Sequence, residues 1–411
     1  MRTIFLAFAI LFGFVARTNA QFNFPVSVDT GITKIRFEVD GLLDIQGTSV
    51  RKSLFSKLIF GGQIDESTKD RSFNSHKEIN RFGLNVNNEI RYFHGKGRAF
   101  GYDSISWAVK GGYFAIGNIT YGQDLFGLTF YGNSAYLAQT AIFTNTRFNF
   151  TQFQKIGGGI FEKRTGSSVF LNVVNIQNYA DGFVRKGELT QNEDGSQIDL
   201  VLSGDFSTTK GAEFSKGIGV VLDVDYRINV PWIKNSKTQF QLLAQNLGFA
   251  RINSGLTRYE VDSNYTYSGF ELDQFRNGSN PFGADFSILD SLGIQKTSKK
   301  SWVKLPGYIQ AMKLIDFQSS KKWQSFFGIR LYPTLNTVPS IFGGVFWKPI
   351  TSFGVSSSVA YGGFGGFRTG IYATYVSKSI QISIGTEDVI GLVSQNGFGQ
   401  SLITRIKWDL N

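Results

Sequence analysis

The stretch Ser401-Leu-Ile-Thr-Arg-Ile-Lys-Trp-Asp-Leu-Asn411 decides the fold, because apolar and polar side chains alternate along it. Successive side chains of a β-strand point to opposite faces, so Trp408 and Leu410 share one face, while Arg405 and Lys407 share the other. Helical spacing does not produce this pattern. The sequence therefore predicts a C-terminal strand that has one apolar face and one charged face.

Similar short segments precede this strand from about Trp323 onward, and turn signals such as Gly362–Gly366 separate them. Brief connections of this kind join antiparallel neighbours. A terminal strand with an apolar face would leave an open sheet edge unless it paired with the first strand, which we expect around Ile35 to Val39. Closure removes the edge, so the fold class we predict is all-β, a closed antiparallel transmembrane β-barrel.

The alternating segments add up to about 14 strands, within a range of about 12 to 16. A content of 47 Gly, 40 Phe and 16 Tyr against 7 Pro suits many strands, tight turns and aromatic girdles. A secreted β-sandwich or β-solenoid could share this composition and remains the alternative. Two long charged stretches, 44–81 and 250–305, are expected to form long loops, and either could fold inward as a plug.

Residues 1–20 have the features of a signal peptide, with Arg2, an apolar run from Ile4 to Val15, and a small residue at Ala20. We expect one domain after it, an outer-membrane β-barrel spanning 21–411, in the outer membrane of a Gram-negative bacterium. The sequence contains no Cys, which excludes disulfides and thiolate metal sites.

Several segments are predicted less sharply. A short helix is expected near Ser49 to Phe60, two strands near 104–111 and 113–121, and another strand over Pro306 to Phe317. The periodicity of Asp124 to Asn133 matches neither a strand nor a helix.

The formal net charge is +11, and removal of Arg2 and Arg17 with the signal peptide leaves +9. Strand parity places equal numbers of cations and anions inside the barrel, which favours an ion-pair network that stiffens the wall over a charged selectivity ring. The predicted lumen network consists of Arg36, Glu38, Asp40, Glu89, Arg91, Asp223, Asp225, Arg227, Arg330, Arg405, Lys407 and Asp409.

Tryptophan and lysine residues near segment ends suit the membrane interfaces, where the indole ring anchors and the ammonium group reaches lipid phosphate. The predicted anchors are Trp302, Lys304, Lys322, Trp323 and Trp408. The expected partners are therefore outer-membrane lipid and lipopolysaccharide, and secretion-machine or periplasmic proteins remain open as further partners. Nucleic-acid binding is not expected, because no stacking motif accompanies the basic residues.

No pattern points to catalysis, so we expect no enzymatic activity, no catalytic residues, no cofactor and no metal site. The two histidines, His76 and His94, are not placed beside a carboxylate and a nucleophile as a catalytic base would be. The turn Gln191–Ser196 is rich in oxygen ligands but lacks the fixed spacing of a calcium loop, which favours a plain hairpin turn.

Three motifs carry a resemblance: Gly217-Ile-Gly-Val-Val-Leu-Asp-Val-Asp-Tyr226, Gln245-Asn-Leu-Gly-Phe-Ala-Arg-Ile-Asn253 and Asp124-Leu-Phe-Gly-Leu-Thr-Phe-Tyr-Gly-Asn133. Together they resemble an uncharacterised outer-membrane β-barrel family of Bacteroidota. More distantly, the architecture is similar to fatty-acid-transporter barrels and to accessory barrels of the type IX secretion system. The resemblance implies a location and a fold, and it transfers no catalytic residue.

Two functions follow. In the first, the barrel transports or binds a hydrophobic or small solute through a normally blocked lumen. In the second, it is a non-transporting scaffold or accessory barrel of a secretion or gliding machine.

Overall fold

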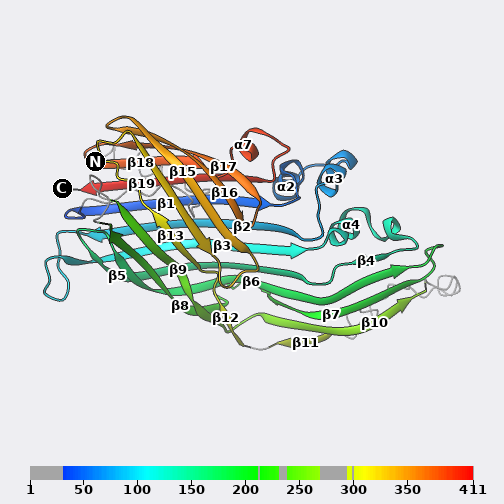
Figure 1. Cartoon of the computed structure of the whole chain (residues 1–411). Coiled ribbons are helices and arrows are strands. Elements are labelled where there is room, and N and C mark those ends of the chain that lie inside the picture. The colour runs from blue at the N-terminus through cyan, green and yellow to red at the C-terminus, as the bar shows by residue number, and fades with distance from the viewer. Residues whose placement is uncertain (1–30, 212, 231–237, 269–293, 299, 411) are drawn as a thin grey trace.

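The computed structural model describes residues 31–211, 213–230, 238–268, 294–298 and 300–410, so the predicted signal peptide lies outside the described residues. Strands make up most of the described chain (Figure 1). Their bounds are β1 Ile35–Gly47, β2 Asn80–His94, β3 Ile105–Tyr121, β4 Thr140–Ile142, β5 Thr146–Glu162, β6 Ser168–Gln191, β7 Ile198–Thr209, β8 Gly217–Asn229, β9 Gln239–Ile252, β10 Leu256–Tyr267, β11 Gln295–Ser298, β12 Ser301–Lys304, β13 Tyr308–Lys313, β14 Trp323–Leu331, β15 Val338–Ile350, β16 Phe353–Gly363, β17 Phe367–Val376, β18 Ile380–Thr386 and β19 Gly399–Leu410.

The helices among the described residues are few and short. They are α2 Lys52–Phe60, α3 Glu66–Phe73, α4 Gln123–Tyr131, the 3₁₀ turn η1 Asn133–Tyr136 and α7 Val389–Val393. Among the described residues, no helix combines the length and the hydropathy needed to cross a membrane.

The sheet closes on itself between the first and last strands. β1 pairs antiparallel with β19 from Ile35↔Leu410 to Gln46↔Gly399, and with β2 on its other side. This confirms the predicted closure of the terminal strand. The closed circuit has 14 strands in the order β1, β2, β3, β5, β6, β8, β9, β13, β14, β15, β16, β17, β18 and β19.

Of the remaining strands, β12 pairs with β9, whereas β4, β7, β10 and β11 continue the sheet beyond one side of the wall. β6 has 24 residues; its first half pairs with β8, and its second half pairs with β7. β7 then pairs with β10, and β10 with β11. We call β4, the start of β5, the end of β6, β7, β10 and β11 the extension sheet, which projects to the lower right in Figure 1. A strand needs only about 9 to 11 residues to cross a bilayer, so the extension sheet lies beyond the span of the barrel.

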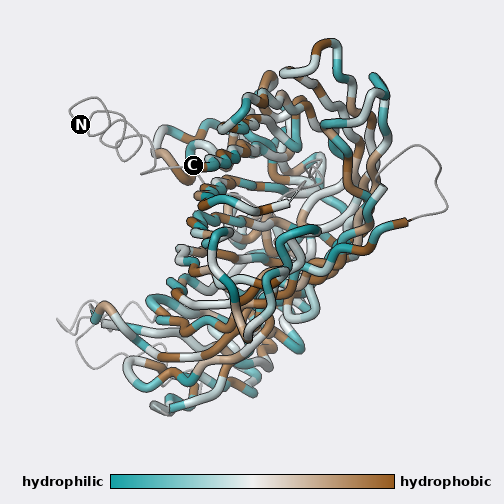
Figure 2. The backbone as a smooth tube through the Cα atoms, turned by 90° about the vertical axis from the view of Figure 1, so that its left-hand side faces the viewer, coloured by the Kyte–Doolittle hydropathy of each residue, from teal (hydrophilic) through white to brown (hydrophobic). Residues whose placement is uncertain are grey.

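Hydrophobic and hydrophilic residues alternate along many strands (Figure 2), and the exposed apolar residues lie on the outer face of the wall. On β18, Ile380, Ile382 and Ile384 are exposed outward, whereas Ser383 between them is buried. Water exposure of such a band would be costly, so it fits contact with lipid acyl chains.

The interior of the barrel is filled with side chains. On β8, Val221 is 1% exposed between the outward-facing Val220 and Leu222, and it packs with other inward apolar residues of β3, β5, β6, β9 and β12. A second apolar cluster on β13 to β16 includes Phe326, Phe342 and Phe346. The lumen is therefore partly an ordinary hydrophobic core.

The helices lie against the outside of the wall, which corrects the idea that 44–81 plugs the lumen. Leu54 and Phe55 of α2 pack with Ile45 and Tyr121, whose side chains have outward parity on β1 and β3. An apolar helix face buried on an apolar outer wall excludes water from both. The predicted helix near Ser49 to Phe60 is confirmed as α2, and it belongs to this outer cover.

Other details differ from the sequence-based expectations. The two strands expected at 104–111 and 113–121 form one 17-residue strand, β3, because Gly111 and Gly112 continue the ladder with β2. Asp124 to Asn133 begins as helix α4. The strand expected over Pro306 to Phe317 is shorter, since β13 covers only Tyr308–Lys313. Of 250–305, the ends form the end of β9, β10, β11 and β12, and 269–293 lies outside the described residues.

Candidate functional site in the barrel lumen

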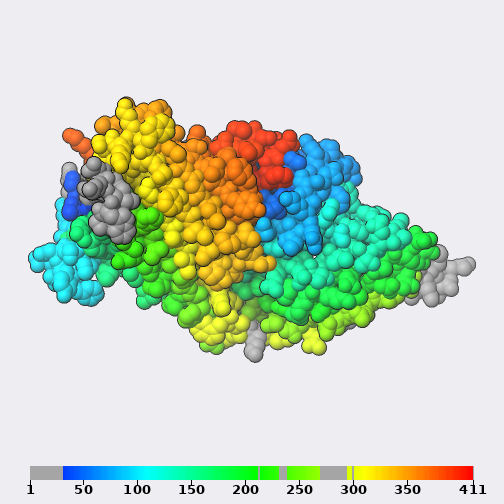
Figure 3. Space-filling model, in the orientation of Figure 1, coloured from blue at the N-terminus to red at the C-terminus, as the bar shows by residue number. Residues whose placement is uncertain are grey.

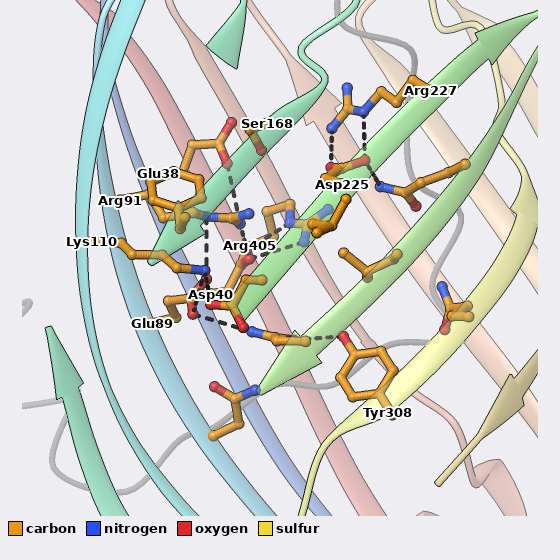
Figure 4. Close-up of a pocket in the computed structure, with 18 of the residues that line it drawn as sticks. Glu38, Asp40, Glu89, Arg91, Lys110, Ser168, Asp225, Arg227, Tyr308 and Arg405 are labelled. Carbon is orange, nitrogen blue, oxygen red and sulfur yellow. Dashed lines mark hydrogen bonds and ion pairs between the residues drawn. The ribbon is translucent and has the colours of Figure 1, made fainter. Parts of the chain in front are cut away.

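The main polar feature of the lumen is a group of buried ion pairs, which we call the lumen charge cluster (Figure 4). It joins side chains from β1, β2, β3, β5, β8 and β19. Its members are Arg36, Glu38, Asp40, Glu89, Arg91, Lys110, Lys155, Asp223, Asp225, Arg227, Arg405, Lys407 and Asp409.

One part of the cluster spans the seam where the barrel closes. Arg405 Nε lies 2.6 Å from Asp40 Oδ1, and Arg405 Nη2 lies 3.0 Å from Asp40 Oδ2. Arg91 from β2 contacts the same carboxylate and also lies 3.1 Å from Glu38. A two-nitrogen contact between a guanidinium and a carboxylate fixes geometry as well as charge. These pairs therefore lock the register of β1 between β2 and β19.

A second part has two lysines at its centre. Lys155 Nζ lies 2.9 Å from Glu89 Oε2 and 2.8 Å from Asp223 Oδ2, and it donates to Asn246 Oδ1 at 2.7 Å. Lys110 Nζ lies 2.5 Å from Asp223 Oδ2 and 3.4 Å from Glu89. Sequence reasoning missed both lysines. Lys110 stood at the end of a strand judged too short, and Lys155 lies next to the Gly-rich run 157–159, whose side-chain pattern is weak.

Asp223 occupies an irregular place in the wall. The register between β8 and β9 shifts between Leu222 and Val224, and Asn246 opposite has a positive φ of 57°. Asp223 Oδ1 accepts the backbone N–H of Asn246 at 2.6 Å. The extra residue lies on β9, so the bulge turns Asn246 inward beside Gln245, while Asp223 keeps the regular inward parity of β8 and lies against the two buried lysines.

Nine of the twelve predicted lumen residues lie in ion pairs at the seam or around Lys155. Asp225 and Arg227 also pair with each other at 2.9 Å on β8. Arg330 is the exception, because it lies apart from the cluster. It donates from Nε to Gln310 Oε1 at 2.8 Å, and its guanidinium stacks 5.2 Å from the ring centre of Tyr308.

A smaller charged group lies nearer the end of the barrel that carries α2, α3, α4 and α7, which we call the helical end. Arg368 from β17 lies 3.8 Å from Asp44 and 3.6 Å from Glu387, and the three side chains are almost fully buried. The sequence analysis did not include these residues in the lumen network. Asp44 stood at the start of the stretch 44–81, which was expected to be a loop, and Glu387 follows the last residue of β18.

Little space remains in the cluster. The cavity between Glu89, Tyr308 and Arg405 has a volume of about 70 Å³. One ordered water needs at least about 10 to 15 Å³ by the same measure, so the cavity has room for a few waters and for no ordinary metabolite.

A short loop closes the lumen above the cluster. In the inner loop, Tyr332–Thr337, Tyr332 and Leu335 are buried against Ile116 and Phe364. The carbonyl of Asn336 accepts hydrogen bonds from Asn118 at 3.3 Å and from Thr120 at 3.1 Å. Within the described residues, this loop and the side chains of the wall fill this part of the lumen, and the central part of the stretch 250–305, which was expected to act as a plug, lies outside the described residues.

Beyond the inner loop lies an open space of about 880 Å³, the mouth hollow. It is lined by two arginines, Arg81 and Arg147, by the acids Glu78 and Asp124, by amides and hydroxyls, and by Ile79, Ile142 and Val338. The Nε atom of Arg81 is buried and has no hydrogen-bond partner among the described residues. Buried donors are nearly always paired, so this unpaired donor marks a place for an ordered water beside the mouth hollow.

The predicted interface anchors fall into two groups. Trp323 and Trp408 lie outward at the end of the barrel that carries the chain termini, and Trp323 stacks on Trp347 with ring centres 5.7 Å apart. Lys322 is exposed directly before β14. Trp302 and Lys304 are exposed on β12, where Trp302 packs edge-on against Phe249 at 5.3 Å. An anchoring role for these residues remains a prediction.

Neither histidine is arranged as a catalytic base. His76 Nδ1 lies 2.8 Å from the carbonyl of Ser72, and its Nε2 lies 3.0 Å from the hydroxyl of Tyr121. His94 stacks on Trp107 at the outer rim, with ring centres 4.8 Å apart. The described residues contain no group of three or more His, Asp or Glu side chains that could hold a metal ion.

No protein-family model and no curated protein match this chain. Several solved structures are similar at 8% sequence identity. The Pseudomonas putida toluene transporter TodX has a TM-score of 0.33, covering 91% of this chain and 87% of that one. The deltaS2S3 mutant of TodX, a monoaromatic hydrocarbon channel, has a TM-score of 0.38 with 92% and 90% covered. The transport unit of the Escherichia coli autotransporter AIDA-I has a TM-score of 0.24 with 92% and 90% covered. Similarity this low carries no functional argument, so the conclusions rest on the geometry of this barrel.

Proposed function

We propose that this chain is an outer-membrane β-barrel whose helical end faces the outside of the cell. Two observations support this orientation. The connections at the terminal end are short, for example the two residues between β15 and β16, whereas the helical end carries 48–79 and 122–145. Outer-membrane barrels have short periplasmic turns and longer extracellular loops.

We further propose that the barrel binds a small polar solute in the mouth hollow above a lumen that is closed at rest. The mouth hollow is the single observation that carries this proposal. Its volume of about 880 Å³ falls within the range of about 300 to 1,000 Å³ typical of small-molecule sites. Its two arginines and its amides suit a solute with carboxylate, phosphate or hydroxyl groups.

The lumen charge cluster disfavours a purely hydrophobic solute. Such a molecule could pass only by displacing buried ion pairs, and a buried charge that loses its partner costs about 3 to 5 kcal/mol. The cluster sits on strands of the wall, so no single loop movement removes it. Passage of any solute would need a rearrangement of both the inner loop and the cluster.

Binding can be tested with a reporter in the mouth hollow. The chain has no native cysteine, so Gln123→Cys can carry the only environment-sensitive fluorophore. We expect saturable fluorescence changes with at least one of citrate, glucose 6-phosphate and glucose, and at least a tenfold weaker response after Arg81→Gln with Arg147→Gln.

The same label on Glu193→Cys, at the tip of the extension sheet, is the matched control and should not respond. No saturable response to any of the three solutes would contradict the binding proposal. Large stable single-channel steps from the unmodified protein in planar bilayers would contradict the closed lumen.

A second candidate function, that of a scaffold, is favoured by the extension sheet. Within the described residues, β11 covers Thr257 to Glu260 of β10, and no strand pairs with Val261 to Thr266 on that side. An uncovered edge can pair with a strand of another protein. Hydrogen exchange at these amides tests this candidate, because a partner in the native membrane would slow exchange relative to the purified barrel.

A further inference from the structure

Two helices at the helical end expose apolar side chains that the barrel itself does not use. The exposed fractions are 55% for Leu58, 48% for Ile59 and 67% for Phe60 on α2, and 49% for Ile390, 49% for Leu392 and 78% for Val393 on α7. We call these six side chains the α2–α7 platform. A cluster of this kind on an exposed surface usually marks an interaction site.

The two helices are held side by side although they are far apart in the sequence. Lys52 Nζ at the start of α2 donates to the carbonyls of Gly391 at 2.7 Å and Leu392 at 3.3 Å in α7. The backbone N–H groups of Lys52 and Ser53 bond to the carbonyls of Gly397 and Gln395. Figure 3 shows α7 in red beside the blue surface of α2 and α3. The platform is therefore one rigid unit, which a nine-residue helix could not form alone.

The platform continues the apolar belt of the barrel. The buried face of α2 covers Ile45 and partly covers Leu43, which stand in the same outward row of β1 as Val39 and Phe37. α7 follows β18, whose outward row is Ile380, Ile382 and Ile384. Both helices thus sit where the lipid-facing wall meets the longer loops.

The charges beside the platform indicate which kind of molecule covers its apolar side chains. The segment 51–61 contains Arg51, Lys52 and Lys57 and no acidic residue, and 389–397 contains no charged residue. Lys57 pairs with Asp65 at 3.0 Å, whereas Arg51 and Lys52 donate to carbonyl and hydroxyl oxygens. Apolar side chains next to cations are the pattern of helices that lie in a membrane interface, where acyl chains meet anionic headgroups. A protein partner would not require continuity with the belt, whereas lipid does.

We propose that the α2–α7 platform inserts into the outer leaflet and binds lipid molecules that have acyl chains and anionic phosphate headgroups. This inference rests on the proposed membrane location, but it does not depend on solute binding. The platform would hold the helices that pack on the outer wall, which we call the helical cover, and the rim of the mouth hollow at a set depth in the leaflet.

The absence of native cysteine makes depth measurement direct. Ile59→Cys and Leu392→Cys would each carry a single NBD fluorophore, and the protein would be reconstituted into phosphatidylcholine and phosphatidylglycerol vesicles with a shallow or a deep spin-labelled lipid. We expect both labels to be quenched at least twofold more by the shallow quencher than by the deep one. Slower migration after boiling would verify that each variant is folded.

Two controls separate the possible failures. A label on Ile382→Cys, in the middle of the belt, should be quenched most by the deep quencher, and a label on Glu193→Cys should be quenched by neither. If Ile382→Cys is not quenched, the membrane location fails. If Ile382→Cys is quenched but both platform labels behave like Glu193→Cys, the lipid platform alone is overturned. Efficient Ile59→Cys crosslinking between copies at low protein density would overturn it in favour of a second copy of the chain.

Discussion

The barrel lumen and the extension sheet contain arginine–aspartate pairs of the same length in opposite surroundings. Arg405 Nε lies 2.6 Å from Asp40 Oδ1, and Arg185 Nη1 lies 2.6 Å from Asp205 Oδ1. The side chains of the first pair are 9% and 8% exposed, and those of the second are 48% and 27% exposed. Water screens the second pair and must be removed from the first, so equal distances do not imply equal energies.

This contrast assigns different roles to charge in the two regions. In the lumen, each buried charge is committed to partners on neighbouring strands, and the loss of one member leaves another without compensation. On the extension sheet, charges keep one face soluble beyond the membrane while the opposite face holds the aromatic row Phe148, Phe206 and Tyr259. Buried charges thus help to specify how the barrel closes. Exposed charges on the extension sheet contribute only to its solubility.

The largest expected effect comes from breaking the lumen pair. Arg405→Gln leaves Asp40 buried with Arg91 as its remaining cation, so we expect a loss of about 3 kcal/mol, near the low end of the range for buried pairs. The matched change Arg185→Gln should cost less than about 1 kcal/mol. Urea unfolding in detergent, followed by gel mobility without boiling, measures both. Equal losses would show that the comparison of the two pairs is wrong.

An intermediate effect is expected on the outer faces of the two regions. Ile371 is 48% exposed in the middle of β17, so Ile371→Arg places a cation against acyl chains and should cost about 2 to 4 kcal/mol. Val261→Arg, in the same row as Tyr259 on the extension sheet, should be nearly neutral, because that sheet stands in water. Refolding yield into vesicles compares the two variants. If Val261→Arg impairs insertion as strongly, the extension sheet lies within the bilayer.

The smallest effect concerns the helical cover, which is intermediate in burial. Burial lowers the pKa of His76 below its usual value, so the folded protein favours the neutral imidazole. The neutral His76 ring therefore contributes fully to the stability of the fold above about pH 6.5. This contribution declines as the pH falls through the lower pKa of the folded state. Limited proteolysis between α2 and β2 should become faster at pH 5 than at pH 7.5.

His76→Gln serves as the control for this measurement. The amide does not titrate in this range, so the variant should lose the difference in cleavage rate between the two pH values. An unchanged pH dependence would place the responsible group elsewhere.

The alternation of side chains was readable from the sequence by itself because it is a local property. A strand exposes every second residue on the same face, so Ile380, Ile382 and Ile384 had to share a face wherever the strand lay. The charges on the opposite parity of β1 and β19 then identified the inner face. Their pairing, Glu38↔Lys407 and Asp40↔Arg405, follows from the predicted closure together with the register that the structure shows.

Only the tertiary structure decided which distant segments meet. Lys155 obtains its partners from β2 and β8, and the bulge opposite Asp223 lies on the neighbouring strand β9. The stretch 44–81 could have packed inside or outside, because an apolar helix face is buried equally well on either surface. The outward Ile45 and Tyr121 provided the apolar surface, while the inner side of the same strands was already occupied by Asn85, Asn118 and the inner loop. Local pattern therefore determined the two faces of the wall, and competition for space between remote segments determined what filled and covered it.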